Sequence, residues 1–143
     1  MLKTKIKLRT PKLGSNKRKE EKKLIQKCDE LVSKIVRLRD GRCVCCGSRE
    51  NLQCGHLIKR GRMSTRFDLV NCNCQCSRCN YKHNHYPEYY TDWFVLTYGV
   101  DKYHELFRRS WQTKDWTLTE LTELKEELQQ KLDELLKSKV ESE

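Results

Sequence analysis

The stretch that decides the fold runs from Cys43 to Asn80 and reads CVCCGSRENLQCGHLIKRGRMSTRFDLVNCNCQCSRCN. It opens with the pattern Cys-x-x-Cys-Gly and closes with the pattern Cys-x-x-Cys-Asn. Two residues between paired cysteines let backbone N–H groups turn onto the sulfurs, and four thiolates make a closed, tetrahedral zinc site. The stretch therefore predicts a structural zinc ion. Its ligands are Cys43, Cys46, Cys76 and Cys79.

The chain has nine cysteines, so five need another interpretation. Cys45, Cys72 and Cys74 lack the required spacing and are interpreted as bystanders. Cys54 lies in the segment between the two pairs. Cys28 falls on the apolar stripe of a predicted helix, where a cysteine behaves as a small core residue.

The segment between the two cysteine pairs has the pattern of a β-hairpin. Residues 51–58 predict a first strand and residues 67–71 a returning strand, joined by a basic loop at 59–66. A helical element is expected from Asn80, with a turn at Pro87. Together these elements predict a ββα unit that zinc holds together.

One histidine and two asparagines of this stretch suit phosphodiester hydrolysis. A neutral imidazole, with a reference pKa of about 6.5, is a good general base, so His56 is the candidate base. Asn71 would hold the imidazole in the right tautomer, and the amide oxygen of Asn80 is a hard ligand for Mg²⁺ or Mn²⁺. Taken singly, the histidine could equally be a packed strand residue and the asparagines could be turn residues. Their joint spacing between the two cysteine pairs favours a catalytic site. The predicted phosphate contacts are Lys59, Arg60, Arg62 and Arg66.

The flanking segments have the spacing of amphipathic helices. Apolar residues recur every three or four positions in residues 17–39, which predicts a helix that ends at Asp40-Gly41. The pattern Thr-x-x-Glu at 117–120 is a capping box, and the leucine row after it predicts a helix to about residue 140. A helix this long exceeds a small core, so we expect it to pack on the 17–39 helix and to offer surface for a homodimer.

These patterns divide the chain into three parts and predict one mainly helical α+β domain. Residues 1–16 have little periodicity and predict a flexible basic arm. Residues 17–116 hold the first helix, the cysteine-rich stretch and two shorter helices at 89–99 and 100–110. The aromatic side chains of 89–99 are interpreted as core residues. Residues 117–143 are the C-terminal amphipathic helix.

The net charge is +10 and is unevenly distributed. Residues 1–23 carry ten Lys or Arg against two Glu, whereas residues 117–143 carry four against eight acidic residues. A basic body with an acidic tail favours a polyanionic partner such as nucleic acid. The chain has no apolar run long enough for a membrane span and no secretion signal, and an odd cysteine count does not suit a disulfide framework. We therefore predict a cytoplasmic protein with no membrane partner.

With these motifs, the chain resembles the phage NinG (Rap) recombination nuclease family over Asp29 to Asn80. The core is also similar to the phage Holliday-junction endonuclease VII type, within the HNH (His-Me finger) superfamily. The later run from Tyr98 to Leu106 fits the C-terminal half of the NinG family. The pieces that carry the resemblance are VRLRD at 36–40, CVCCG at 43–47, Gly55-His56, RFD at 66–68, Asn71 and QCSRCN at 75–80.

The resemblance implies a zinc-stapled ββα-metal core and a metal-dependent endonuclease for branched recombination intermediates, namely Holliday junctions and D-loops. In this reading His56 is the base, Asn71 positions it and Asn80 binds the catalytic metal. A phage protein of this kind would act in the host-cell cytoplasm, and two coordinated cuts argue for a homodimer. One departure is that Gly55 stands where many HNH sites have an Asp or His ligand. Candidates for the second ligand are Asn84, then His83, then His85 and Gln53.

Two other functions stay open at this point. A non-catalytic, zinc-dependent DNA-binding module would need the zinc and the basic arm but not His56. An HNH restriction or homing-type nuclease would cut linear DNA at a chosen sequence.

Overall fold

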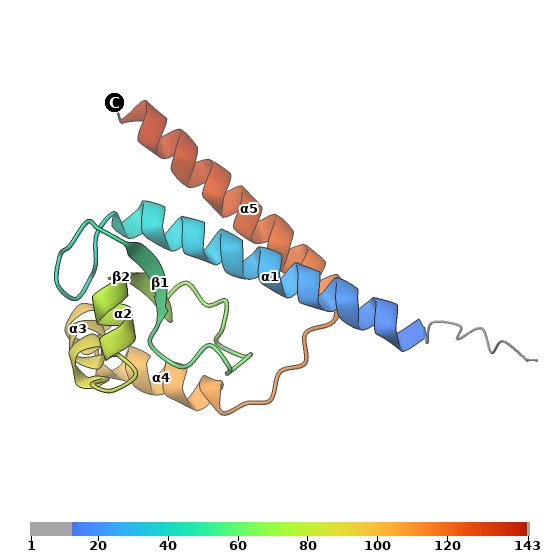
Figure 1. Cartoon of the computed structure of the whole chain (residues 1–143), viewed down its shortest axis with the longest axis horizontal. Helices are drawn as coiled ribbons and strands as arrows, with labels where there is room; N and C mark the ends of the chain where they lie inside the picture. Colours follow the sequence, from blue (N-terminus) through green and yellow to red (C-terminus); the bar gives the residue numbers. More distant parts are fainter. Residues whose placement is uncertain (1–12, 143) are drawn as a thin grey trace, which may run out of the picture.

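The computed structural model describes residues 13–142, which form a mainly helical α+β structure with one two-stranded antiparallel sheet (Figure 1). Two long helices lie along one side of the molecule, and the sheet and three shorter helices lie together beside them (Figure 1). The elements in chain order are α1 (Leu13–Asp40), β1 (Leu52–His56), β2 (Cys72–Cys76), α2 (Ser77–Lys82), α3 (Glu88–Tyr98), α4 (Val100–Ser110) and α5 (Leu118–Glu141).

Helix α1 begins earlier than the apolar periodicity predicts. It starts at Leu13, so residues 13–16 of the predicted arm are helical, while residues 1–12 of that arm lie outside the described residues. Long, unbranched Lys, Arg and Glu side chains lose little freedom in a helix, which allows the polar first turns. The predicted end is confirmed: α1 stops at Asp40, and Gly41 adopts φ 68°, a left-handed conformation that glycine tolerates.

Helices α1 and α5 pack together and bury the main core. Cys28 is fully buried, and its Sγ lies 3.8 Å from the carbonyl oxygen of Leu121 on α5, which confirms its interpretation as a core residue. Helix α5 separates from α1 toward its C-terminal end, where Val140 is 74% exposed (Figure 1). The predicted packing of the two helices is therefore confirmed for most of their length. Their buried residues are Cys28, Leu31, Val32, Ile35 and Val36 of α1 and Leu121, Leu128 and Leu132 of α5.

The second strand is not where the sequence predicts it. β2 occupies Cys72–Cys76 and pairs with β1 in the register that places His56 opposite Cys72. Residues 67–71 belong instead to a compact loop, which backbone hydrogen bonds such as Asp68 N–H to the Thr65 carbonyl (3.2 Å) hold in turns. Every residue of β2 is buried, polar Asn73 and Gln75 included, so it shows no alternation of apolar and polar positions that could reveal a strand.

The end of α1 fastens this strand to the core. The guanidinium of Arg39 donates to the carbonyl oxygens of Leu69 (2.8 Å) and Cys72 (3.0 Å). Asp40, paired with Arg39 at 2.8 Å, accepts the backbone N–H of Cys74 at 2.9 Å. Charged side chains at the end of α1 thus satisfy polar backbone groups that burial of β2 would otherwise leave unpaired.

The short helix α2 begins at Ser77 and ends at Lys82. Asn80 therefore lies in its middle, and the predicted helical continuation toward Pro87 is wrong, because residues 83–85 form turns. Helix α3 starts directly after Pro87, a residue that suits the start of a helix, and Gly99 separates it from α4.

The aromatic residues of α3 divide between core and surface. Tyr90 and Phe94 form a second core cluster with Leu57 and Leu106, as the sequence predicts. Tyr89 and Tyr98 are 70% and 39% exposed, so the core interpretation is wrong for those two side chains.

Helix α5 begins at the predicted capping box. Thr117 accepts the backbone N–H of Glu120 at 3.1 Å, whereas the carboxylate of Glu120 pairs with Lys114. The indole N–H of the preceding Trp116 donates to the carbonyl of Met63 at 3.0 Å, which joins the start of α5 to the basic loop. Within residues 13–142, no helix is both long and apolar enough to cross a membrane.

Candidate functional site

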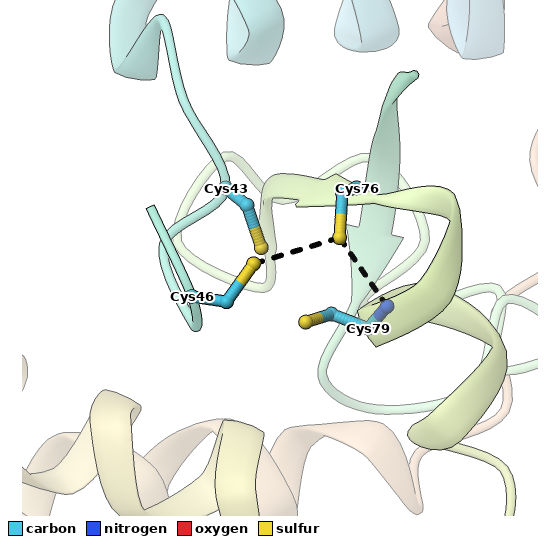
Figure 2. Close-up of side chains that lie close together, drawn as sticks. All are labelled: Cys43, Cys46, Cys76 and Cys79. Carbon is cyan, nitrogen blue, oxygen red and sulfur yellow. Dashed lines mark hydrogen bonds between the residues drawn. The ribbon is translucent and has the colours of Figure 1, made fainter. Parts of the chain in front are cut away.

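The four cysteines predicted to bind zinc converge on one point (Figure 2). Cys43 and Cys46 come from the turn after α1, Cys76 from the end of β2, and Cys79 from α2. All four sulfurs lie within 4.8 Å of one another, and those of Cys46 and Cys76 are 3.7 Å apart. A tetrahedral site with Zn–S bonds of about 2.3 Å requires sulfurs about 3.8 Å apart. The cluster can therefore hold a zinc-like ion with little rearrangement.

A tight turn shapes the first half of this cluster. Gly47 adopts φ 78° and donates its N–H to the carbonyl of Cys43 at 2.9 Å. The N–H of Val44 bonds the carbonyl of Cys74 at 2.8 Å and fixes the turn to β2. Burial alone would raise the pKa of the Cys43 thiol. Hydrogen bonds from nearby backbone N–H groups outweigh this effect and lower the pKa of Cys43 to about 7. This environment favours the thiolate form that binds a cation.

The other cysteines of the stretch lie outside the cluster. Cys45 accepts a hydrogen bond from Gln75 Nε2 at 3.3 Å, and Cys74 is fully buried in the main core. The sulfurs of Cys54 and Cys72 lie on the sheet, within 4.8 Å of each other and of a ring nitrogen of His56.

A pocket of about 670 Å³ adjoins this sheet on the side of α1. It brings together most of the residues predicted for catalysis, catalytic-metal binding and phosphate contact, and also a polar face of α1. That face was not predicted to belong to the site, although the spacing of three and four positions between its polar residues is visible in the sequence. The predicted site residues in the pocket are Gln53, His56, Lys59, Arg60, Asn80, His83 and Asn84, and those from α1 include Gln26, Asp29, Glu30, Ser33, Lys34 and Arg37.

The His56 ring is held by a backbone carbonyl. Its Nε2 lies 2.9 Å from the carbonyl oxygen of Arg66, and because a carbonyl only accepts, Nε2 carries the proton and Nδ1 keeps a lone pair. Burial lowers the pKa of His56, which favours the neutral imidazole. The ring therefore has the protonation state that a general base needs.

Asn71 does not hold the imidazole, and its predicted role is corrected. Its side chain is fully buried and spans the loop, accepting from the N–H of Ile58 at 2.8 Å and donating to the carbonyls of Ile58 and Thr65, both at 3.1 Å. Asn71 thus fixes the loop that carries Arg66, whose carbonyl in turn orients His56.

Asn71→Ala is expected to destabilise the fold by about 2–4 kcal/mol, because it leaves buried backbone groups of the loop unpaired. Urea unfolding of the zinc-loaded protein measures this change. Asn84→Ala, at an exposed turn position, is the matched control and should change stability by less than about 0.5 kcal/mol. Equal stability of the two variants would contradict the bracing role of Asn71.

Asn80 and its neighbours present amide groups to the pocket. Asn80 Nδ2 donates to Gln53 Oε1 at 2.9 Å, which leaves Oδ1 as the atom for a cation. Asn84 is exposed in the turn after α2 and still lines the same pocket, although the helix ends before it. His83 is less suited to a metal, because its Nε2 donates to the carbonyl of Leu57 at 2.8 Å and the remaining ring nitrogen, Nδ1, is buried.

Gly55 is explained by its neighbour across the sheet. A Cβ at this position would lie 2.0 Å from Oε1 of the buried Gln75, and the Gly55 carbonyl accepts from the hydroxyl of Tyr90 at 2.7 Å. Successive strand residues point to opposite faces, so a side chain at position 55 would point away from the side of His56. The space for a ligand before His56 is therefore taken by Gln75.

Gly55→Ala is expected to cost about 1–3 kcal/mol of stability through overpacking. The double variant Gly55→Ala with Gln75→Ala removes the clash and should recover part of that loss, which a double-mutant cycle in urea measures. Strict additivity of the two changes would contradict a direct clash.

The basic loop contributes fewer free cations than predicted. Arg66 makes two bonds to the Asp29 carboxylate, at 2.6 and 3.0 Å, and its side chain is only 15% exposed, so its predicted phosphate contact is wrong. Arg62 stacks on Trp111, with 4.3 Å from its guanidinium carbon to the ring centroid. Arg60 also bonds Asp29 at 2.8 Å but remains largely exposed, as does Lys59. Lys59 and Arg60 are therefore the cations of the loop that line the pocket.

Comparison with known proteins identifies a family for this chain. The family model described as the bacteriophage lambda NinG protein matches residues 2–139, which include the cysteine cluster and all residues of the pocket. No curated protein and no solved structure gives a significant match. The chain therefore belongs to the bacteriophage lambda NinG family, whose phage proteins are implicated in recombination.

Proposed function

We propose that this protein is a metal-dependent endonuclease that hydrolyses phosphodiester bonds in branched recombination intermediates such as Holliday junctions and D-loops. The observation that carries the proposal is the pocket, in which a neutral His56 and the Asn80 amide lie together with Lys59 and Arg60. An HNH-type site would use groups of these kinds, and membership in the NinG family supports recombination intermediates as the substrate class.

The residues of the pocket divide into three roles. His56 accepts the proton of the attacking water at Nδ1, while its Nε2–H stays on the Arg66 carbonyl. The amide oxygens of Asn80 and Asn84 suit a hard cation and would hold Mg²⁺ or Mn²⁺, and His83 supports the pocket wall. A bound ion of this kind supplies the positive charge that stabilises the transition state.

The charge around the pocket supports DNA as the partner. Lys34, Arg37, Lys59 and Arg60 line it, and the chain as a whole carries +10. The negative charge of Asp29 is balanced by Arg60 and Arg66. Their positive charges outweigh the effect of burial and lower the pKa of the Asp29 carboxyl. Such a surface grips phosphates by position, so the geometry of the branch, and not base sequence, selects the substrate.

A homodimer would supply the two active sites that paired cuts at a junction need. The end of α5 offers apolar surface for it, since Leu136 and Val140 are 48% and 74% exposed. The substrate and the protein would meet in the host-cell cytoplasm.

The direct test compares a four-way junction with a linear duplex of the same sequence, each incubated with the protein and Mg²⁺. Cleavage of the junction well above that of the duplex is expected. Tight junction binding without any cleavage would instead establish a non-catalytic zinc-dependent DNA-binding module. Cleavage of the duplex at one sequence, equal to that of the junction, would establish a restriction or homing-type nuclease.

A further inference from the structure

We propose that Cys54, His56 and Cys72 form a second zinc site, separate from the four-cysteine cluster, and that Zn²⁺ bound there switches the proposed nuclease off. The regulatory half rests on the proposed function, whereas the metal site itself does not.

The sheet register builds this second site. Cys54 and His56 are two residues apart on β1, so both point to the same face, and His56 is the direct partner of Cys72 on β2. The two sulfurs and a ring nitrogen of His56 lie within 4.8 Å of one another. These distances allow the three side chains to ligate one ion.

The surrounding backbone already orients two of the three side chains. The Arg66 carbonyl oxygen lies 2.9 Å from His56 Nε2 and 3.3 Å from Cys72 Sγ. Ligating histidines commonly donate their second ring N–H to a backbone carbonyl in this way, which fixes the ring and its tautomer. With Nδ1 as the ligand atom, His56 would keep the Arg66 bond as the outer hydrogen bond of a metal ligand.

The donor set selects zinc over magnesium. Two thiolates and one imidazole suit Zn²⁺, whereas Mg²⁺ prefers oxygen ligands. Cys54 and His56 line the large pocket while Cys72 is fully buried, so an ion entering from the pocket would keep its fourth position toward solvent. Three protein ligands with an open fourth position are a known arrangement for zinc.

Zinc binding and base catalysis compete for the same electron pair. A neutral imidazole has one nitrogen lone pair, and a Zn²⁺ ion on either ring nitrogen uses it. His56 bound to zinc therefore cannot accept a proton from water. Zinc at this site would block the proposed reaction even when Mg²⁺ is present.

Metal stoichiometry tests the site without reference to activity. Protein saturated with Zn²⁺ and then desalted is expected to retain two zinc ions per chain by elemental analysis, and Cys54→Ala should retain one. Cys28→Ala, a buried cysteine outside both clusters, is the matched control and should retain two. A single zinc in the wild type, or two in Cys54→Ala, would overturn the proposal.

Junction cleavage in Mg²⁺ with increasing Zn²⁺ tests the consequence. The wild type and Cys28→Ala should lose cleavage at zinc concentrations that leave Cys54→Ala active. Equal inhibition of all three proteins would overturn the regulatory half. If the wild type holds two zinc ions but cleaves no DNA in Mg²⁺ alone, the proposed function fails while the second site stands.

Discussion

Cys43→Ser is expected to abolish cooperative folding of the protein. The variant removes one of four sulfurs that join the turn after α1, the end of β2 and helix α2 (Figure 2). Structural zinc sites contribute an apparent binding free energy of about 10–16 kcal/mol, which is as large as the whole stability of a typical domain, about 5–15 kcal/mol. Loss of the ion should therefore remove the thermal unfolding transition, as followed by circular dichroism.

The neighbouring Cys45→Ser is the matched control for this prediction. Cys45 lies within the same turn but outside the cluster, where it accepts a bond from Gln75. The Cys45→Ser variant should retain the zinc ion of the four-cysteine cluster and should still show the thermal unfolding transition. A chelator added to the wild type should reproduce the effect of Cys43→Ser. An unchanged melting curve in either case would show that the four cysteines pack as free thiols.

His56→Ala is expected to lower the rate of junction cleavage by about 10²–10⁴-fold, the usual contribution of a general base. That loss corresponds to about 3–5 kcal/mol in the activation barrier. Single-turnover cleavage in Mg²⁺, with the protein in excess over the junction, measures the chemical step. Junction binding should stay within a few-fold of the wild type, because Lys59 and Arg60, the proposed phosphate contacts, still line the pocket.

His85→Ala controls for the loss of an imidazole as such. His85 is exposed, packs against Tyr81 with 5.4 Å between ring centroids, and does not line the pocket. It should cleave at the wild-type rate. Full cleavage activity of His56→Ala would contradict the role of His56 as general base. An equal loss of cleavage rate in His85→Ala would show that the effect is not specific to the pocket.

The sequence predicts those features that depend on local spacing. The interval of two residues within each cysteine pair identifies the four sulfurs, and these meet in the structure. The apolar repeat of α1 and the leucine row of α5 predict two helices and their packing, and Thr117 marks the start of α5. In each case the signal lies within a few residues, so no knowledge of the fold is needed to read it.

Features that depend on contacts between distant segments cannot be predicted from local spacing. β2 is buried on both faces, so its polar residues hide the strand. Asn71 and Arg66 have side chains suited to a catalytic site. In the fold, however, Asn71 bonds the backbone of its own loop, and Arg66 pairs with Asp29. The polar face of α1 belongs to the pocket only because α1 packs beside the sheet.

The sequence by itself therefore determined the cysteine cluster and the long helices, and it singled out His56 and Asn80, which line the same pocket. Tertiary structure alone decided which groups surround that pair. Gly55 is the clearest case, because its lack of a side chain follows from Gln75 on the neighbouring strand. Spacing along the chain fixes what a segment can form, whereas the packing of remote segments fixes what each side chain contacts.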